Sequence, residues 1–429
     1  MRLERFAALL GALSSVEAKA VFAHFMVGNV ASLTQAGWGE EIALAQQAGI
    51  DGFALNIAAG DTSNAQSLTR GFAAAEARDF KLFFSFDYEA WGAWDSGVVI
   101  NLVNQYQDSA AYWKHDNGGP LISTFEGTNN VGDWPEIKDA TGGFFIPDWS
   151  SIGPDAAVGT GVVDGLFSWE AWPSGANDMT TGPDLAYRNA LGNDRPYMMP
   201  VSPWFYTNLP GYNKNWLWRG DDLWFDRWQQ VLEIQPEYVQ IITWNDWGES
   251  HYIGPLREDQ FGLFEPGNGD APINYAAGMP HDGWRKFLPY LIAQYKTGSA
   301  SISEEGLTTW YRRNPNTACA SGGTGSGPNG QMEPPVTAVS QDKVFFSALL
   351  NSDATVAVSI GGNSQPASWE HVPSGGSGLY HGSVDLDSRT GDVVVTVSRD
   401  GVEVVRVDGA SITADCAGGI VNWNAWVGS

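Results

Sequence analysis

Three segments follow one another near the start of the chain: VFAHFMV (residues 21–27), WGEEIALAQQAG (38–49) and GFALNI (52–57). The first and third are short and almost continuously apolar, whereas the middle one places its apolar residues at helical spacing. Continuous apolar runs are typical of strands that are covered on both faces, as in parallel sheets. The pattern therefore predicts a strand, a helix and a parallel strand. An open doubly wound sheet is the alternative, but no GxGxxG motif follows the first strand.

Further β-rich runs begin at residues 81, 121, 143, 165, 197 and 239. The mean spacing of the runs is about 31 residues, the length of one strand, one helix and two loops. Between the runs lie amphipathic segments at 38–49, 65–79, 96–116, 184–191, 221–235 and 282–295, and the helices after the fourth and fifth runs look short. Eight strands joined by right-handed crossovers predict a (β/α)8 TIM barrel over residues 21–320.

The composition changes at residues 321–335, SGGTGSGPNGQMEPP, which are typical of a flexible linker. Beyond them, runs such as KVFFSALL and DVVVTVSRDG alternate with a period of two, and this predicts a C-terminal antiparallel β-sandwich over residues 336–429. The tryptophans of this part are Trp369, Trp423 and Trp426. With so few of them, we expect it to brace the barrel rather than to bind a polymer.

Residues 1–20 contain Arg2 and Arg5, then an apolar stretch and small residues, which is the pattern of a short secretory signal. An irregular amino terminus is the alternative. Cys319 and Cys416 form an even pair that suits one disulfide in an oxidising compartment, and two buried thiols are the alternative. No other apolar run approaches the ~20 residues needed to cross a membrane. We therefore expect a secreted protein without a membrane partner.

The chain of 429 residues has 49 acidic and 23 basic residues, a net charge of −26. Such a surface repels phosphate backbones, so we expect no nucleic-acid partner. The six histidines form no HxH or HExxH pair and there are only two cysteines, so neither a metal site nor a cofactor is predicted. A GxSxG elbow and a P-loop are also missing from the sequence.

Polar residues follow the predicted strands, where the loops of a parallel barrel converge over one face. These are His24, Asn56, Asp87, Glu126, Asp148, Glu170, Asn245, Asp246 and Glu249. Carboxylates at strand ends often cap the following helix, but five strands with such a carboxylate favour an active site. Aromatic residues stand among them: Trp149, Trp169, Trp204, Tyr206, Trp247 and Tyr252. Because sugar C–H faces lie flat on aromatic rings while hydroxyls bond to carboxylates and amides, we expect all these residues to contact a carbohydrate.

The segment TWNDWGES (243–250) places Asp246 and Glu249 three residues apart between two tryptophans. Cleavage of a glycosidic bond needs one protonated carboxylic acid and a second carboxylate that acts as a base or nucleophile. A separation of roughly 6.5–9.5 Å leaves room for a water and inverts the anomeric configuration, whereas roughly 5 Å gives retention. The sequence predicts the pair but not its spacing.

The chain resembles the fungal α-1,3-glucanases, or mutanases, of glycoside hydrolase family 71. The segments that carry the resemblance are AVFAHFMVGN (20–29), GIDGFALNI (49–57), LFFSFDY (82–88), FIPDW (145–149) and, most specifically, ITWNDWGESHYIGP (242–255). The resemblance implies an inverting hydrolase of α-1,3-glucan in the fungal cell wall or outside the cell. It also implies Asp246 and Glu249 as the catalytic pair, and we assign Glu249 as the general acid and Asp246 as the general base. We expect a monomer.

Two other functions compete with this interpretation. A non-catalytic glucan-binding wall protein would keep the aromatic residues, but it would need no acid pair. A barrel glycosidase that acts on another linkage, such as α-1,4 or β-1,3, would keep both. Activity on a panel of linkages separates the three.

Overall fold

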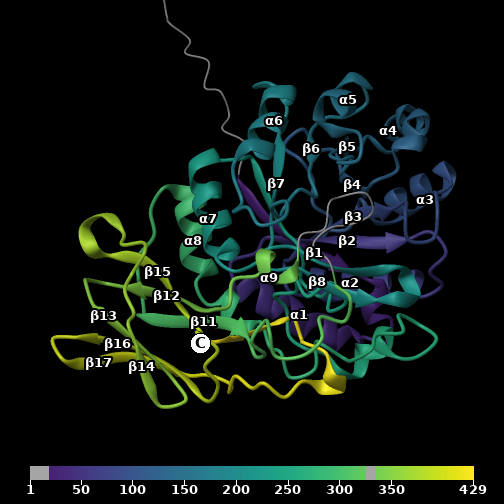
Figure 1. Cartoon of the computed structure of the whole chain (residues 1–429). Coiled ribbons are helices and arrows are strands. Elements are labelled where there is room, and N and C mark those ends of the chain that lie inside the picture. Colours follow the sequence, from purple (N-terminus) through teal and green to yellow (C-terminus); the bar gives the residue numbers. More distant parts are fainter. Residues whose placement is uncertain (1–18, 325–334) are drawn as a thin grey trace, which may run out of the picture.

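The computed structural model describes residues 19–324 and 335–429 (Figure 1). Most of the predicted leader and most of the predicted linker therefore lie outside the described residues. Eight strands form one parallel sheet in the order β5-β4-β3-β2-β1-β10-β7-β6. They are β1 (Ala20–Met26), β2 (Gly52–Ala58), β3 (Lys81–Asp87), β4 (Leu121–Phe125), β5 (Phe144–Phe145), β6 (Leu166–Phe167), β7 (Tyr197–Val201) and β10 (Tyr238–Ile241).

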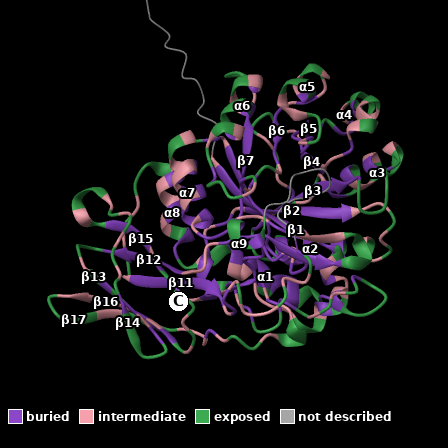
Figure 2. Ribbon diagram, viewed as in Figure 1, coloured by how far each residue is buried: buried purple, intermediate pink, exposed green. Residues whose placement is uncertain are grey.

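A helix follows each of these strands, which is the alternation of a TIM-like fold. The helices are α1 (Gln35–Gln47), α2 (Asn64–Glu76), α3 (Ser96–Tyr106), α4 (Trp134–Thr141), α5 (Gly153–Gly159), α6 (Gly182–Leu191), α7 (Leu223–Ile234) and α8 (Leu288–Thr297). The parallel strands are almost wholly buried, and exposed residues lie on the outer faces of the helices and in loops (Figure 2). The continuous apolar runs thus correspond to strands covered on both faces, as predicted.

Successive side chains of a strand point to opposite faces of the sheet, so the position along the strand decides which of them lie on the inner face, away from the helices. In β1, Phe25 packs on Trp38 of α1, so its neighbours His24 and Met26 point to the opposite face. The same alternation in β2 and β3 places Asn56 and Asp87 on that inner face, in register with β1. The polar residues predicted at the strand ends are therefore brought to one region.

The runs at residues 143 and 165 form strands of only two residues each. Pro147 follows β5 and has no N–H to donate to a ladder, which ends the regular pairing. Asp148 nevertheless forms parallel bridges to Phe125 on one side and to Phe167 on the other. Asp148 thus pairs with the last residue of β4 and with the last residue of β6.

The C-terminal part consists of two four-stranded sheets, β15-β12-β11-β18 and β14-β13-β16-β17. Their strands are β11 (Gly306–Arg312), β12 (Lys343–Leu350), β13 (Thr355–Ile360), β14 (Asn363–Gln365), β15 (Gly378–Asp385), β16 (Val393–Arg399), β17 (Val402–Asp408) and β18 (Ala425–Gly428), and the short helix α9 (Val336–Val339) precedes β12. All pairings are antiparallel, and side chains of both sheets share one apolar core. Strand β11 comes before the Gly/Pro-rich segment and yet belongs to these sheets.

The two parts of the chain are packed together through polar and apolar contacts. Arg312 forms a buried ion pair of 2.9 Å with Asp221, just before α7. The ring of Phe225 in α7 stacks on His381 of β15, with centroids 4.3 Å apart, and α7 and α8 lie beside the antiparallel sheets (Figure 1). Cys319 and Cys416 form the predicted disulfide. In the part of the chain that the structure describes, no helix has both the length and the apolar character needed to span a membrane.

Candidate active site

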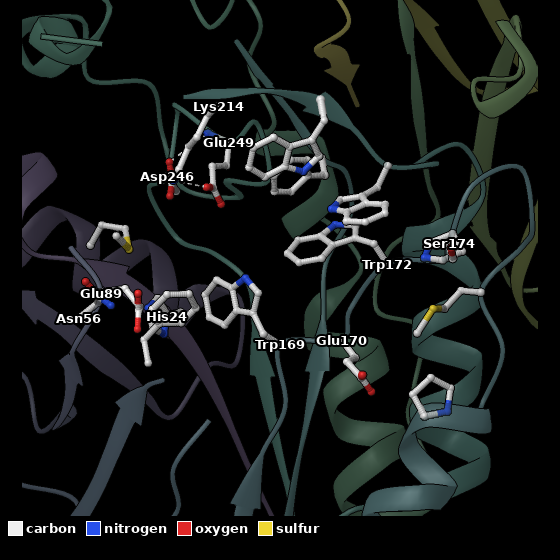
Figure 3. Close-up of a pocket in the computed structure, with 18 of the residues that line it drawn as sticks. His24, Asn56, Glu89, Trp169, Glu170, Trp172, Ser174, Lys214, Asp246 and Glu249 are labelled. Carbon is white, nitrogen blue, oxygen red and sulfur yellow. Dashed lines mark hydrogen bonds and ion pairs between the residues drawn. The ribbon is translucent and has the colours of Figure 1, made fainter. Parts of the chain in front are cut away.

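A cavity of about 880 Å³ opens at the carboxyl ends of the parallel strands (Figure 3). It brings together the predicted residues His24, Asn56, Asp87, Trp169, Glu170, Asp246 and Glu249. Other lining residues that are aromatic or charged are Glu89, Phe125, Trp172, Asp178, Phe205, Lys214, Trp216 and Trp218. Its wall therefore combines carboxylates with partly exposed rings, as expected for a carbohydrate site.

A β-hairpin inserted between β7 and α7 supplies one side of this cavity. It consists of β8 (Tyr206–Leu209) and β9 (Lys214–Leu217), joined by the short turn η3 (Pro210–Tyr212). Asn215 ties the hairpin to the end of the segment after Cys319, because its side chain contacts Thr324 Oγ1 at 2.7 Å and the carbonyl of Gly322 at 3.3 Å. The hairpin places Lys214 and Trp216 in the cavity, and neither residue is predicted from the ends of the parallel strands. The turn residues Pro-Gly between two short β-rich runs were the available signal.

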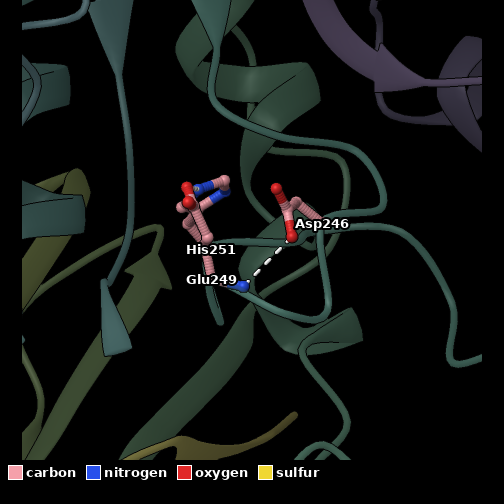
Figure 4. Close-up of side chains that lie close together, drawn as sticks. All are labelled: Asp246, Glu249 and His251. Carbon is pink, nitrogen blue, oxygen red and sulfur yellow. Dashed lines mark hydrogen bonds and ion pairs between the residues drawn. The ribbon is translucent and has the colours of Figure 1, made fainter. Parts of the chain in front are cut away.

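Asp246 and Glu249 lie in the loop after β10 (Figure 4). The backbone N–H of Glu249 donates to Asp246 Oδ1 at 3.0 Å, so the aspartate also caps the turn between them. The backbone N–H of Asp246 in turn donates to the hydroxyl of Thr243 at 2.9 Å. In the described part of the chain, the second oxygen of Asp246 has no hydrogen-bond partner. It is therefore available to a ligand in the cavity.

Both oxygens of Glu249 are held by nitrogen donors. Lys214 Nζ lies 2.6 Å from Oε1, and His251 Nε2 lies 2.9 Å from Oε2. The other ring nitrogen of His251 lies 3.1 Å from the Thr243 hydroxyl, which fits the tautomer with its proton on Nε2. The backbone N–H of Tyr206 donates to the Glu249 carbonyl at 3.1 Å, which connects the hairpin to the same loop. Glu249 is thus fixed from both sides.

The two carboxyl groups have pKa values that move in opposite directions. Burial and the nearby negative charge of Glu249 raise the pKa of Asp246, against the lowering effect of His251 and Lys214. Burial alone would also raise the pKa of Glu249, but Lys214 and His251 outweigh it and hold that pKa below its ordinary value. These directions favour a proton on Asp246 and a negative charge on Glu249. This order is the reverse of the acid and base roles expected from the sequence.

Asp246, Glu249 and His251 each offer one ligand atom within 4.8 Å of the other two. A metal cation is a poor occupant of this cluster, because the ammonium of Lys214 already lies 2.6 Å from Glu249 and would repel it. The same geometry means that the closest oxygens of Asp246 and Glu249 are at most 4.8 Å apart. The cluster fits a coupled pair of acids better than a metal site.

A row of rings lines the cavity next to this pair, and Trp172 and Phe205 lie 5.5 Å and 5.6 Å from the ring of His251. Trp169 packs edge-on against His24 at 5.0 Å and against Trp172 at 6.4 Å. Trp172 then packs edge-on against Phe205 at 5.0 Å, and Phe205 stacks on Trp216 at 5.6 Å. Trp169 and Trp172 remain partly exposed. Their faces offer successive surfaces on which sugar rings can pack.

His24, Asn56 and Asp87 lie on the other side of the cavity. His24 is fully buried, and its Nδ1 pairs with the side-chain amide of Gln240 at 2.9 Å. Burial lowers the pKa of His24 to about 3, so the imidazole is neutral. Asn56 donates to Asp87 Oδ2 at 3.3 Å, while the other oxygen of Asp87 accepts from the backbone N–H groups of Glu89 and Ala90. Asp87 therefore combines a capping role with a place in the cavity wall.

Glu126, Asp148 and Trp149 do not line the cavity, although the sequence places them among the predicted substrate contacts. Glu126 accepts from the N–H and hydroxyl of Ser151. Asp148 is fully buried and accepts from the N–H and hydroxyl of Ser150, and burial raises its pKa to about 8. Trp149 is buried and donates to the Glu126 carbonyl at 3.1 Å. These carboxylates cap turns, a role close to the helix capping that is the competing interpretation of strand-end acids.

The remaining predicted contacts, Trp204, Tyr206, Asn245, Trp247 and Tyr252, are also buried outside the cavity wall. Trp204 donates to the carbonyl of Trp423 at 2.9 Å in the C-terminal part, Asn245 pairs with the backbone of Met26, and Tyr252 stacks on His281 at 3.8 Å. Trp247 packs against Phe261, and Tyr206 against Tyr275. They hold the loops of the site in place.

The comparison with known proteins agrees with the resemblance of the segment after β10. A family model described as Glycosyl hydrolase family 71 matches residues 17–429. Glucan endo-1,3-alpha-glucosidase agn1 of Schizosaccharomyces pombe is 33% identical over 430 residues, which cover 96% of this chain and 94% of that protein. A mutanase of Penicillium rubens is 34% identical over 427 residues, which cover 97% and 90%. An ascus wall endo-1,3-alpha-glucanase of S. pombe is 28% identical over 366 residues, which cover 80% and 82%. The chain therefore belongs to glycosyl hydrolase family 71.

Proposed function

We propose that this protein hydrolyses α-1,3-glucan in the cavity at the carboxyl ends of the parallel strands. The substrate is inferred from the relatives, two of which are named as 1,3-alpha-glucan hydrolases and one as a mutanase. The observation that carries the reaction is the pair Asp246 and Glu249, whose pKa values are moved apart beside a row of partly exposed rings. A glucan-binding wall protein without activity would need the rings but not this pair.

In the proposed reaction, Asp246 donates a proton to the leaving glycosidic oxygen. Its raised pKa and its free oxygen suit it to this step. Glu249 supplies the negative charge, either to activate a water or to attack the anomeric carbon. Because the pKa of Glu249 is lowered, this carboxylate stays ionised in acidic solution. Activity should therefore fall at low pH as Glu249 becomes protonated, and at higher pH as Asp246 loses its proton.

The stereochemical outcome separates two versions of this mechanism. Inversion is the proposal that follows from the family resemblance. Retention is the second candidate, because the closest oxygens of the pair lie at most 4.8 Å apart, which is compatible with the roughly 5 Å between the carboxyl groups of retaining enzymes. The anomer of the first product, followed by proton NMR during the first turnovers, decides between them.

We also propose that the eight parallel strands close into a (β/α)8 barrel. The bridges of Asp148 to Phe125 and Phe167 support closure between β5 and β6. A shared apolar core supports the arrangement of the antiparallel sheets as a β-sandwich. The ion pair between Arg312 and Asp221 supports a bracing role for this part. The boundary proposed from the sequence places β11 in the barrel, and we propose to count it with the sandwich instead.

The biological setting in this proposal is outside the cell or in the cell wall, where α-1,3-glucan is accessible, and the protein acts as a monomer. One relative is named for the ascus wall.

The direct test of the proposed substrate is release of reducing sugar from α-1,3-, α-1,4- and β-1,3-glucans by the purified protein. The proposal expects release from the first alone. Equal release from another linkage would overturn the substrate, and binding without release would favour the glucan-binding protein.

A further inference from the structure

We infer that Lys214 is a positioning residue of the reaction: from the inserted hairpin, its ammonium and the imidazole of His251 clamp Glu249, so that Glu249 carries the negative charge of the acid pair. This inference rests on the proposed function, because it assigns the cause of the division of roles between Asp246 and Glu249. It concerns a residue far from the WNDWGES segment in the sequence (Figure 3).

The geometry of the clamp is specific to Glu249. Lys214 Nζ approaches Oε1 at 2.6 Å and His251 Nε2 approaches Oε2 at 2.9 Å, so each oxygen has its own donor. Such charge-assisted bonds restrict the rotation of the carboxylate and favour its ionised form. The Glu249 side chain is only 13% exposed, which limits screening by water. An ion pair here therefore has more effect than one on the open surface.

The position of Lys214 is set by the fold of the hairpin. Lys214 is the first residue of β9 and pairs with Leu209 of β8. At the other end of β8, the N–H of Tyr206 bonds to the Glu249 carbonyl. The next residue, Asn215, is held by Thr324 and Gly322. The ammonium is thus delivered by a segment that is anchored on both sides of it.

The charges that face Glu249 leave Lys214 as the dominant positive group. The titratable neighbours are Asp246 and His251 in the same loop, Lys214 on the hairpin, and His24 and Asp87 at the ends of β1 and β3. His24 is neutral, and neither aspartate can supply a positive charge. Among the described residues that line the cavity, Lys214 is the only lysine or arginine. Removing it would leave the acid pair without a permanent positive charge.

The test compares Lys214→Met with Lys214→Arg, and with Lys138→Met as the matched control. Lys138 forms a similar partly buried ion pair, 2.7 Å from Asp164, but outside the cavity wall. Without the ammonium, the pKa of Glu249 rises, so the acidic limb of the kcat profile should move to higher pH by about 1–3 units. We expect kcat to fall at least 10-fold at the original optimum while KM changes less than 3-fold. Arginine should restore much of the loss, and Lys138→Met should match the parent protein.

A chemical rescue keeps the inference testable if Lys214→Met folds poorly. In Lys214→Cys the thiol at residue 214 is the only free one in the described chain, since Cys319 and Cys416 are bonded to each other. Its thiolate displaces bromide from 2-bromoethylamine, which forms a C–S bond and a side chain that ends in an ammonium like that of lysine. Alkylation of the folded protein should return both kcat and the acidic limb toward the parent values.

Three outcomes would overturn the inference. An unmoved pH profile with a raised KM would make Lys214 a substrate contact. A kcat unaffected by Lys214→Met would remove any role, and failure of the ammonium to restore activity to folded Lys214→Cys would exclude the charge as the cause. None of these affects the proposed function, which fails separately if Glu249→Gln keeps full turnover.

Discussion

Four buried parallel strands, β3, β4, β5 and β10, share one sequence feature: a carboxylate stands at the end of the strand or in the loop after it. At the first three of these strands, Asp87, Glu126 and Asp148 each accept N–H groups from residues in a nearby turn. In the loop after β10, Glu249 is held by a lysine and a histidine, and Asp246 leaves one oxygen toward the cavity. Asp246 also accepts a turn N–H, from Glu249, so a cap alone does not distinguish the two groups. The comparison teaches that the lysine and histidine on Glu249, and the second oxygen of Asp246, are what set the pair apart.

The largest difference between the two regions should appear when each carboxylate is replaced by its amide. Glu249→Gln and Asp246→Asn should each reduce kcat by about 10²–10⁴-fold, the usual contribution of a general acid or base. Glu126→Gln should leave kcat within about 3-fold, because it can still accept hydrogen bonds from Ser151. Rates on α-1,3-glucan and circular dichroism spectra of the three variants measure this. Comparable losses of kcat in all three variants would contradict the distinction between reactive carboxylates and turn caps.

A second difference concerns stability, and it singles out Asp148. Burial raises the pKa of Asp148 to about 8, against about 3.9 in an unfolded chain. The folded protein therefore retains a proton that the unfolded chain releases, so the contribution of this group is complete below about pH 4 and is lost as the pH rises toward about 8. Asp148→Asn should remove this dependence.

The measurement is urea unfolding of the parent protein and of Asp148→Asn at several pH values from 4 to 8. The free energy of unfolding of the parent should fall relative to that of the variant as the pH rises. Parallel curves for the two proteins would mean that Asp148 is already ionised in the folded state. Asp148 would then be a charged carboxylate like Glu249 and not a neutral turn cap.

The smallest expected effect comes from the rings that accompany the two regions. Trp169 after β6 lines the cavity, whereas Trp91 after β3 is 72% exposed and lies outside its wall. Trp169→Ala should raise KM for a short soluble α-1,3-oligosaccharide by about 2- to 12-fold, which corresponds to about 0.5–1.5 kcal/mol for one ring contact. Trp91→Ala serves as the matched control and should leave KM unchanged. An equal effect of both would extend the binding surface beyond the cavity.

The order of strands and helices could be predicted from the sequence because buried parallel strands give continuous apolar runs at a regular spacing. The carboxylates Asp246 and Glu249 could be found for the same reason, since they follow the last of these runs. Lys214 does not follow from this periodicity, because it lies on a hairpin inserted into a loop. The Pro-Gly turn marks the hairpin, but it does not reveal that Lys214 enters the cavity. Trp204 and Tyr252, which the sequence places among the expected contacts, lie outside the cavity wall, because periodicity does not reveal that the C-terminal part packs against them.

The contacts of Asn215 with Gly322 and Thr324 limit how this enzyme can be re-engineered by domain exchange. They join the hairpin that carries Lys214 to a segment tethered through Cys319 to the far end of the chain. A fusion that replaced everything after the parallel sheet with a foreign binding module would keep every strand of that sheet and still withdraw support from the charged side of the cleft. We therefore expect the parallel sheet and the C-terminal part to be kept together in evolution.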